Sequence, residues 1–187
     1  PDPTPGKRQF IRFGGVSIRA TVRVNGVEAG RHAGAFTAFC FEVTPFLRPT
    51  GNRLEVVADN RRDLDAPPGS GDFTLYGGVY RDVTWLETDE TCIDPCVDGG
   101  PGVEVSADAR GRVSVRAHVR GDAARARLSY EICGRRYDTS SFSVPDVRPW
   151  TPETPNLHEL KVILEADGAR DCVVQRIGFR DAEFRAD

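Results

Sequence analysis

Residues 72–83 read Asp-Phe-Thr-Leu-Tyr-Gly-Gly-Val-Tyr-Arg-Asp-Val. Two adjacent glycines, two tyrosines and an Arg-Asp pair stand at the beginning of a predicted strand. The pair Gly77-Gly78 permits a close approach of the backbone or a β-bulge. Tyr76, Tyr80 and Arg81 are therefore predicted to form a structural clasp in the fold around them.

Upstream of this stretch, apolar and polar residues alternate, as they do in a strand with one solvated face. Ile18, Ala20, Val22 and Val24 are the apolar positions, and Asn25-Gly26 then gives a strong hairpin-turn signal. The other expected elements are strands at 36–43, 54–58 and 79–87, one helical turn at 45–47 and a polar loop at 59–71.

A second run of strands is expected after the breaker Asp98-Gly99-Gly100-Pro101-Gly102. The strand candidates are 103–105, 113–119, 127–132, 139–144, 158–164 and 172–179. Short strands at close spacing, with no helical period between them, are typical of a β-sandwich. We therefore expect two all-β units, at residues 1–90 and 91–187.

The composition is that of an ordinary soluble globular protein, with 39% apolar and 28% charged residues. No apolar run approaches the ~20 residues of a membrane span, and no signal peptide is recognisable. A net charge of −3 argues against a nucleic-acid partner, which calls for a basic surface. We therefore expect a soluble, bacterial-type protein without nucleic-acid or membrane partners. The sequence is compatible with a cytoplasmic, a periplasmic or a secreted protein.

Five cysteines cannot all pair with one another. Cys40 lies between two phenylalanines, where a small buried thiol is expected. Cys92 and Cys96 form a CxxxC pair, with no second pair at zinc-like spacing. Spacing alone does not establish a disulfide between them. The redox state of the compartment therefore stays open as well.

Three blocks of the sequence resemble glycoside hydrolase family 2, which contains β-galactosidases, β-glucuronidases and β-mannosidases. The blocks are 13–44 with its Asn25-Gly26 hairpin and Phe41-Glu42-Val43-Thr44, then 72–83, then 149–158 followed by Gly178-Phe179-Arg180. His158 stands where the family usually has Tyr. The resemblance implies a galactose-binding-like jelly-roll β-sandwich over 1–90, N-terminally truncated, and an immunoglobulin-like β-sandwich over 91–187.

The resemblance also implies a role. The family cleaves glycosides with two glutamates on a (β/α)8 barrel, one of them in an Asn-Glu step, and this sequence has neither that step nor a helix-rich barrel pattern. It implies a non-catalytic front part of a retaining β-galactosidase-type enzyme, with no catalytic residue and no activity alone. The implied partners are the enzyme's own catalytic barrel and a β-galactoside or related sugar. Missing first strands would leave unpaired sheet edges, so homo-oligomers are expected.

Candidate sugar contacts lie in and just after the polar loop. The resemblance places Asp72 at the rim of the sugar site, where a carboxylate contacts sugar hydroxyls or a bound sodium ion. It implies sodium or magnesium in the parent enzyme and no cofactor in this chain. Arg62 and Asp65 are expected to line the entrance to the barrel. The structural alternatives are an Asx turn at Asp72 and a solvated charged loop at 61–65.

Two other functions compete with this interpretation. An autonomous carbohydrate-binding module would need exposed aromatic residues on one face or in one loop cluster. An adhesion or spacer protein would explain the second unit but has no need of residues 72–83. We interpret Trp85 as a core residue, Trp150 as a plug of the second sandwich and His32 as structural, which favours the enzyme part.

Overall fold

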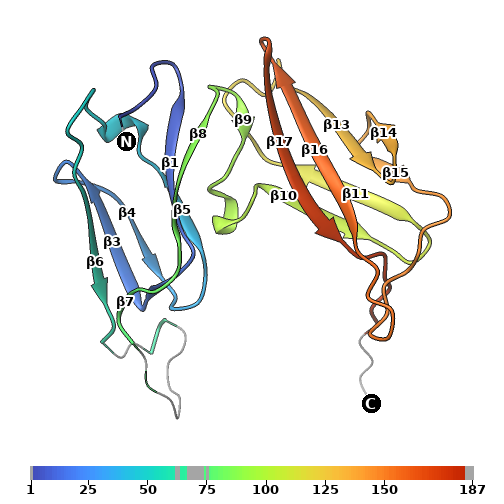
Figure 1. Ribbon diagram of the computed structural model, residues 1–187, viewed down its shortest axis with the longest axis horizontal. Coiled ribbons are helices and arrows are strands. Elements are labelled where there is room, and N and C mark those ends of the chain that lie inside the picture. The colour runs from blue at the N-terminus through green and yellow to red at the C-terminus, as the bar shows by residue number, and fades with distance from the viewer. Residues whose placement is uncertain (1, 62–63, 67–73, 75, 184–187) are drawn as a thin grey trace. The chain divides into compact units, whose positions relative to one another are not determined.

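The computed structural model describes residues 2–61, 64–66, 74 and 76–183 (Figure 1). The chain forms two compact units. Unit 1 comprises residues 1–90 and 94–102, and unit 2 comprises 91–93 and 103–187. The described residues form strands and two short 3-10 turns, η1 (Thr44–Phe46) and η2 (Val97–Gly99). The predicted all-β class is therefore confirmed.

The first sheet of unit 1 is built on β1 (Arg8–Phe13), which pairs antiparallel with β5 (Phe39–Glu42) and β8 (Val83–Thr88). β1 is a central strand, and its side chains Phe10 and Phe13 are fully buried. A central position explains why this strand carries so many apolar residues. The sequence had not singled it out as a strand.

The second sheet of unit 1 is built on β3 (Arg19–Val24), between β4 (Val27–Ala33) and β6 (Leu54–Asp59). The alternation predicted for this strand is confirmed, because Ala20, Val22 and Val24 are at most 3% exposed. Asn25 and Gly26 both take positive φ values, 52° and 84°. A two-residue hairpin turn of this kind needs left-handed backbone at both central positions.

The two sheets of unit 1 enclose one apolar core. Ile11, Phe13 and Phe39 from the first sheet meet Ala20 and Val22 from the second. A short pair of strands, β2 (Val16–Ser17) and β7 (Gly78–Val79), joins the sandwich at one end. Unit 1 is therefore a β-sandwich.

Unit 2 is a second sandwich. Its larger sheet has the order β14 (Arg135–Tyr137), β13 (Arg127–Ile132), β16 (His158–Ala166) and β17 (Ala169–Ile177). Its other strands are β10 (Val103–Ala107), β11 (Arg112–Ala117) and β15 (Ser141–Ser143) in one sheet, and β9 (Cys92–Ile93) with β12 (Val119–Arg120) in a short pair. The core between them includes Val113, Val115, Leu160, Val162 and Phe179.

Some expected boundaries differ from the structure. The strand expected at 79–87 is two strands, β7 and β8, because Tyr80–Asp82 leave the ladder to contact neighbouring loops. The strand expected at 36–43 begins only at Phe39. The glycine-rich segment around Gly30 contains the edge strand β4. Among the described residues, no helix is long and apolar enough to cross a membrane.

Candidate functional site

In unit 1, Tyr80 and Arg81 form the clasp that the sequence predicted. The hydroxyl of Tyr80 donates to the carbonyl oxygen of Ala35. The guanidinium of Arg81 donates to the carbonyl oxygens of Phe36 at 2.9 Å and Gly14 at 3.3 Å. Because both side chains bind backbone carbonyls, they fix the 34–38 loop against the motif. The clasp prediction is confirmed for these two residues.

Tyr76 does not belong to this clasp. Its side chain is 78% exposed, so the predicted structural role is wrong for this tyrosine. Gly77, the next residue, makes the predicted close approach: a Cβ atom there would lie 2.9 Å from the side chain of Asn60. The backbone therefore passes tightly by the end of β6 while Tyr76 points into solvent.

The polar loop begins at an ion pair. Nε of Arg61 lies 3.0 Å from Oδ1 of Asp59, and Nη2 lies 2.5 Å from Oδ2. Hydrogen bonds from Arg61 lower the pKa of Asp59 to about 2. Further along, Ala66 is fully buried beside Ile18 and Ala35. The loop is thus attached to the sandwich at two points.

Of the predicted sugar contacts, Asp65 lies among the described residues. Asp65 is exposed and directly precedes the buried Ala66. Asp72 and Arg62 lie outside the described residues, so their predicted roles stay predictions, as does the sodium ion expected at Asp72. Among the residues that are described, no group of three or more His, Cys, Asp and Glu side chains could hold a metal ion.

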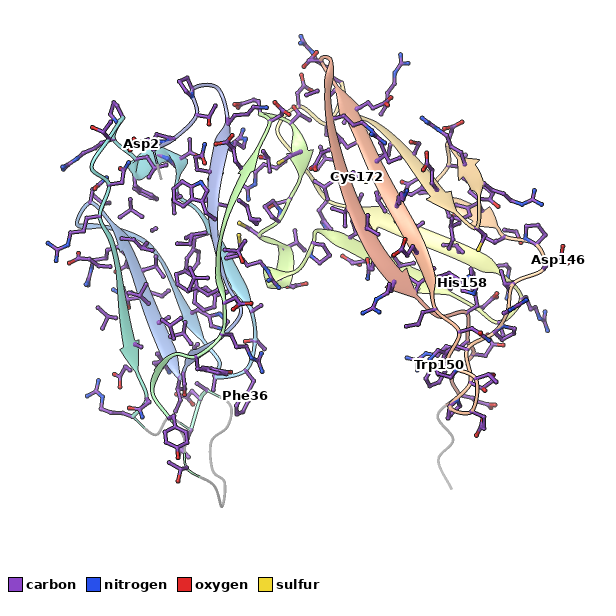
Figure 2. The ribbon with its side chains drawn as sticks, in the orientation of Figure 1. Asp2, Phe36, Asp146, Trp150, His158 and Cys172 are labelled. Carbon is purple, nitrogen blue, oxygen red and sulfur yellow. The ribbon has the colours of Figure 1, made fainter. Side chains whose placement is uncertain are left out.

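Two exposed aromatic residues lie at this clasp. Phe36 is 49% exposed and Tyr80 is 43% exposed, and the clasp brings their segments together. Figure 2 shows Phe36 in the loop that precedes β5. Sequence reasoning missed Phe36, although its position between two small residues, Ala35 and Thr37, was a usable signal of a loop tip.

The two tryptophans differ in their environment. Trp85 packs against the core of unit 1 as predicted, and its indole Nε1 donates to Gln9. Trp150 is half-buried at one end of unit 2 (Figure 2), outside the central core cluster. There its Cγ lies 3.1 Å from where a Cβ of Gly178 would be, and the guanidinium of Arg180 lies 5.3 Å from its ring centroid. Trp150 covers the end of the sandwich rather than filling its interior.

The imidazole of His32 has a structural environment. It stacks on Phe39 with ring centroids 4.2 Å apart, and its Nε2 lies 2.9 Å from the hydroxyl of Thr37. Burial lowers its pKa and so favours the neutral ring. These contacts support the structural interpretation of His32.

The five cysteines are all free thiols. Cys40 is 6% exposed, which confirms the buried thiol expected there. A hydrogen bond with the Cys96 side chain and burial both raise the pKa of Cys40. Cys96 therefore contacts Cys40, and the CxxxC pair of Cys92 and Cys96 is not a disulfide in this structure.

Comparison with known proteins agrees with this architecture. Residues 103–180 match the family described as Glycosyl hydrolases family 2. A β-glucuronidase of Bacteroides fragilis is 33% identical over 94% of this chain, which spans 29% of that protein. A β-galactosidase of Thermoanaerobacter pseudethanolicus is 29% identical over 97% of this chain, which spans 27% of that protein.

Solved structures agree as well. A putative β-galactosidase from Bacteroides fragilis has a TM-score of 0.84 at 28% identity, over 96% of this chain and 31% of that one. Residues 103–180 thus match glycosyl hydrolase family 2, and nearly the whole chain is similar to enzymes of the β-glucuronidase and β-galactosidase type. It matches a non-catalytic N-terminal region of β-galactosidase- and β-glucuronidase-type enzymes and spans about a third or less of their length.

Proposed function

We propose that this chain supports the catalytic barrel of a retaining β-glycosidase of the β-galactosidase or β-glucuronidase type. One observation carries the proposal: the match to a β-glucuronidase runs along 94% of this chain but covers only 29% of that enzyme. A catalytic barrel needs about 250 residues of alternating strands and helices. The described residues contain only strands and 3-10 turns. The substrate would be a β-galactoside, a β-glucuronide or a related sugar.

The polar loop of unit 1 is the part that we propose to reach the sugar. Its start is fixed by Asp59 and Arg61, and its middle by the buried Ala66. Anchored attachments limit the positions that a loop can sample, which favours a defined binding rim. On this proposal Asp72 contacts sugar hydroxyls or a sodium ion, and Arg62 and Asp65 flank it. Sodium or magnesium would belong to the whole enzyme.

The rim is tested in the whole protein. Asp72→Ala should raise KM by about tenfold with a smaller change in kcat, because it removes charged hydrogen bonds to the bound sugar. The matched control is Asp146→Asn, since Asp146 is an exposed loop aspartate of unit 2 (Figure 2). Replacing sodium by potassium should raise the KM of the wild type and leave the KM of Asp72→Ala unchanged. If Asp72→Ala has the same KM as the wild type, Asp72 does not contact the sugar, and the alternative of an Asx turn at Asp72 holds instead.

A second candidate function has one observation in its favour. The exposed rings of Phe36, Tyr76 and Tyr80 supply the loop aromatics that a carbohydrate-binding module requires. Titration calorimetry of the chain with methyl β-galactoside and methyl β-glucuronide distinguishes the two. Millimolar or tighter binding that is lost in Phe36→Ala and Tyr76→Ala would establish a binding module. If the titration gives no measurable heat of binding, the chain is not a binding module and its role is to support the barrel.

We also propose that the chain forms homo-oligomers through its sheet edges. β6 is an outer strand of its three-stranded sheet, and Leu54 and Val57 on it are 43% and 50% exposed. An exposed strand edge with apolar side chains pairs readily with another chain. Size-exclusion chromatography across a wide concentration range tests this. A single monomer peak throughout would contradict it, whereas Val57→Lys should reduce an observed dimer.

A further inference from the structure

A thiol and an imidazole meet on the surface of unit 2. Cys133 and Gly134 form the turn between β13 and β14, and Cys133 takes a positive φ of 50° there. Its Sγ lies 3.3 Å from Nδ1 of His158, the first residue of β16. The thiol is exposed to solvent. The pair is 25 residues apart in the sequence, so the fold creates it.

The hydrogen bonds of His158 fix which ring nitrogen faces the thiol. Its Nε2 lies 3.2 Å from the carbonyl oxygen of Arg148. A carbonyl oxygen only accepts hydrogen bonds, so Nε2 carries the hydrogen of the neutral ring. Nδ1 then presents its lone pair to Cys133. Phe179 packs against the ring, with centroids 5.1 Å apart at 68°. The imidazole is thus oriented to accept the thiol proton.

The pair borders a cavity of about 660 Å³. Arg135, Arg136 and Lys161 line it, as do the carboxylates Glu131 and Glu159. Three cations against two carboxylates leave a net charge of +1. Positive charge stabilises a thiolate, and a cavity of this size admits a small ligand.

We propose that Cys133 is a modification site that reacts with low-molecular-weight disulfides, with His158 as its base. Nδ1 of His158 takes the proton of the thiol, and the resulting thiolate attacks one sulfur of the disulfide R–S–S–R. A Cys133–S–S–R bond forms as the original S–S bond breaks. The departing sulfur leaves as a thiolate and takes the proton from the imidazolium. Cys133 is oxidised and the departing sulfur is reduced, so no further oxidant is needed.

The chain contains its own control. Cys172 is also exposed and lies in the same unit, on β17 (Figure 2). It pairs with Ile163, whereas His158 pairs with Ile177, so the two positions are five residues apart along the sheet register. The backbone N–H of Cys172 donates to the carboxylate of Asp171.

The experiment follows mixed-disulfide formation by peptide mass spectrometry after incubation of the full chain with oxidised glutathione at pH 7. Cys133 should react about tenfold faster than Cys172, because His158 is placed to take the thiol proton as the sulfur attacks. Repeating the measurement in urea gives the intrinsic ratio of the unfolded chain. The ratio of the Cys133 rate to the Cys172 rate in the folded chain should exceed the ratio in urea by a similar factor. Equal ratios in the folded and unfolded chain would overturn the proposal.

Two variants separate the base from the packing of the ring. His158→Tyr keeps an aromatic ring beside Phe179, and His158→Gln keeps an N–H group able to donate to Arg148. Both should slow Cys133 to about the rate of Cys172 and leave Cys172 unchanged, because neither supplies a base. A fast Cys133 in both folded variants would exclude His158 as the base. If either variant fails to fold, the comparison of folded and unfolded wild type still decides the proposal.

Discussion

The indole Nε1 of Trp85 donates a 2.8 Å hydrogen bond to the side-chain oxygen of Gln9, which is completely buried in β1. The Nε2 of Gln9 donates at 2.8 Å to Glu87, on the same strand as Trp85. Its backbone N–H donates at 2.8 Å to the hydroxyl of Thr44. Through its side-chain amide and its backbone N–H, the buried Gln9 therefore joins β1 to β8 and to η1.

Replacing Gln9 should destabilise unit 1. Gln9→Leu would leave the indole N–H of Trp85 without its partner, so we expect a loss of about 1–3 kcal/mol in the free energy of unfolding. Gln175→Leu is the matched control, because the amide oxygen of Gln175 is buried and takes no hydrogen bond within the described residues. Urea unfolding, followed by tryptophan fluorescence and circular dichroism, measures both. Equal losses in the two variants would contradict the network.

Two glycines of unit 2 separate backbone strain from steric collision. Gly111 and Gly168 have φ values of +83° and +81°, so an added Cβ brings similar strain at either position. A Cβ at Gly111 would lie 2.2 Å from the carbonyl oxygen of Val144, whereas one at Gly168 meets nothing within 4 Å. Gly168→Ala should cost about 1–2 kcal/mol.

Gly111→Ala should cost at least about 2 kcal/mol more than Gly168→Ala, because the backbone of Val144 must move. Thermal and urea unfolding of the two variants provide the comparison. Costs that agree within experimental error would mean that the Gly111 turn adapts without strain elsewhere.

The ion pair at the start of the polar loop predicts a pH dependence. Hydrogen bonds from Arg61 lower the pKa of Asp59 from 3.8 to about 2. The contribution of this ion pair to the stability of the folded chain is therefore fully present above pH 3.8 and is lost as the pH falls towards 2. NMR titration of the Asp59 carboxyl should give a midpoint near 2. Arg61→Gln should move it towards 3.8.

A second charge pair of unit 1 is the control for that titration. Arg53 lies 2.8 Å from Glu55 on the surface, so Arg53→Gln should leave the midpoint of Asp59 unchanged. An Asp59 midpoint near 3.8 in the wild type would mean that Arg61 does not hold the start of the loop in solution.

Cys40 should resist alkylation in the native chain far more than the exposed Cys172 does. The hydrogen bond with Cys96 and burial raise its pKa, so its reactive thiolate is scarce at neutral pH. Iodoacetamide labelling from pH 7 to 10, read by peptide mass spectrometry, should modify the exposed Cys172 well before Cys40. Cys96→Ala should accelerate Cys40 only partly, because burial persists. Equal labelling of Cys40 and Cys172 would disprove the buried contact.

Local patterns predicted the parts of the fold in which neighbouring residues carry the signal. The alternation ending at Val24 and the Asn25-Gly26 turn depend on adjacent side chains, and both were found. β4 was missed because an edge strand needs little apolar surface, and its segment is rich in small and charged residues. The interruption at Tyr80–Asp82 was missed because it depends on Ala35 and Phe36, some 45 residues away.

The candidate site was predictable to a smaller extent. Glycine spacing and two tyrosines pointed to the clasp, but no pattern in the sequence distinguishes the solvent-facing Tyr76 from the bonded Tyr80. The contact of Cys133 with His158 has no local signature, because strand register brings the two residues together. For Asp72 and Arg62 the family resemblance remains the basis of the prediction.

The most direct test of the central claim is the hydrolysis of p-nitrophenyl β-galactoside and β-glucuronide by this chain alone and by the whole protein that contains it. The whole protein should hydrolyse one of them, and the chain alone should release no nitrophenol above the buffer rate. Folding of the chain is checked in the same samples by circular dichroism. Turnover by the folded chain alone would contradict the supporting role, because it would place catalytic carboxylates within these two β-sandwiches.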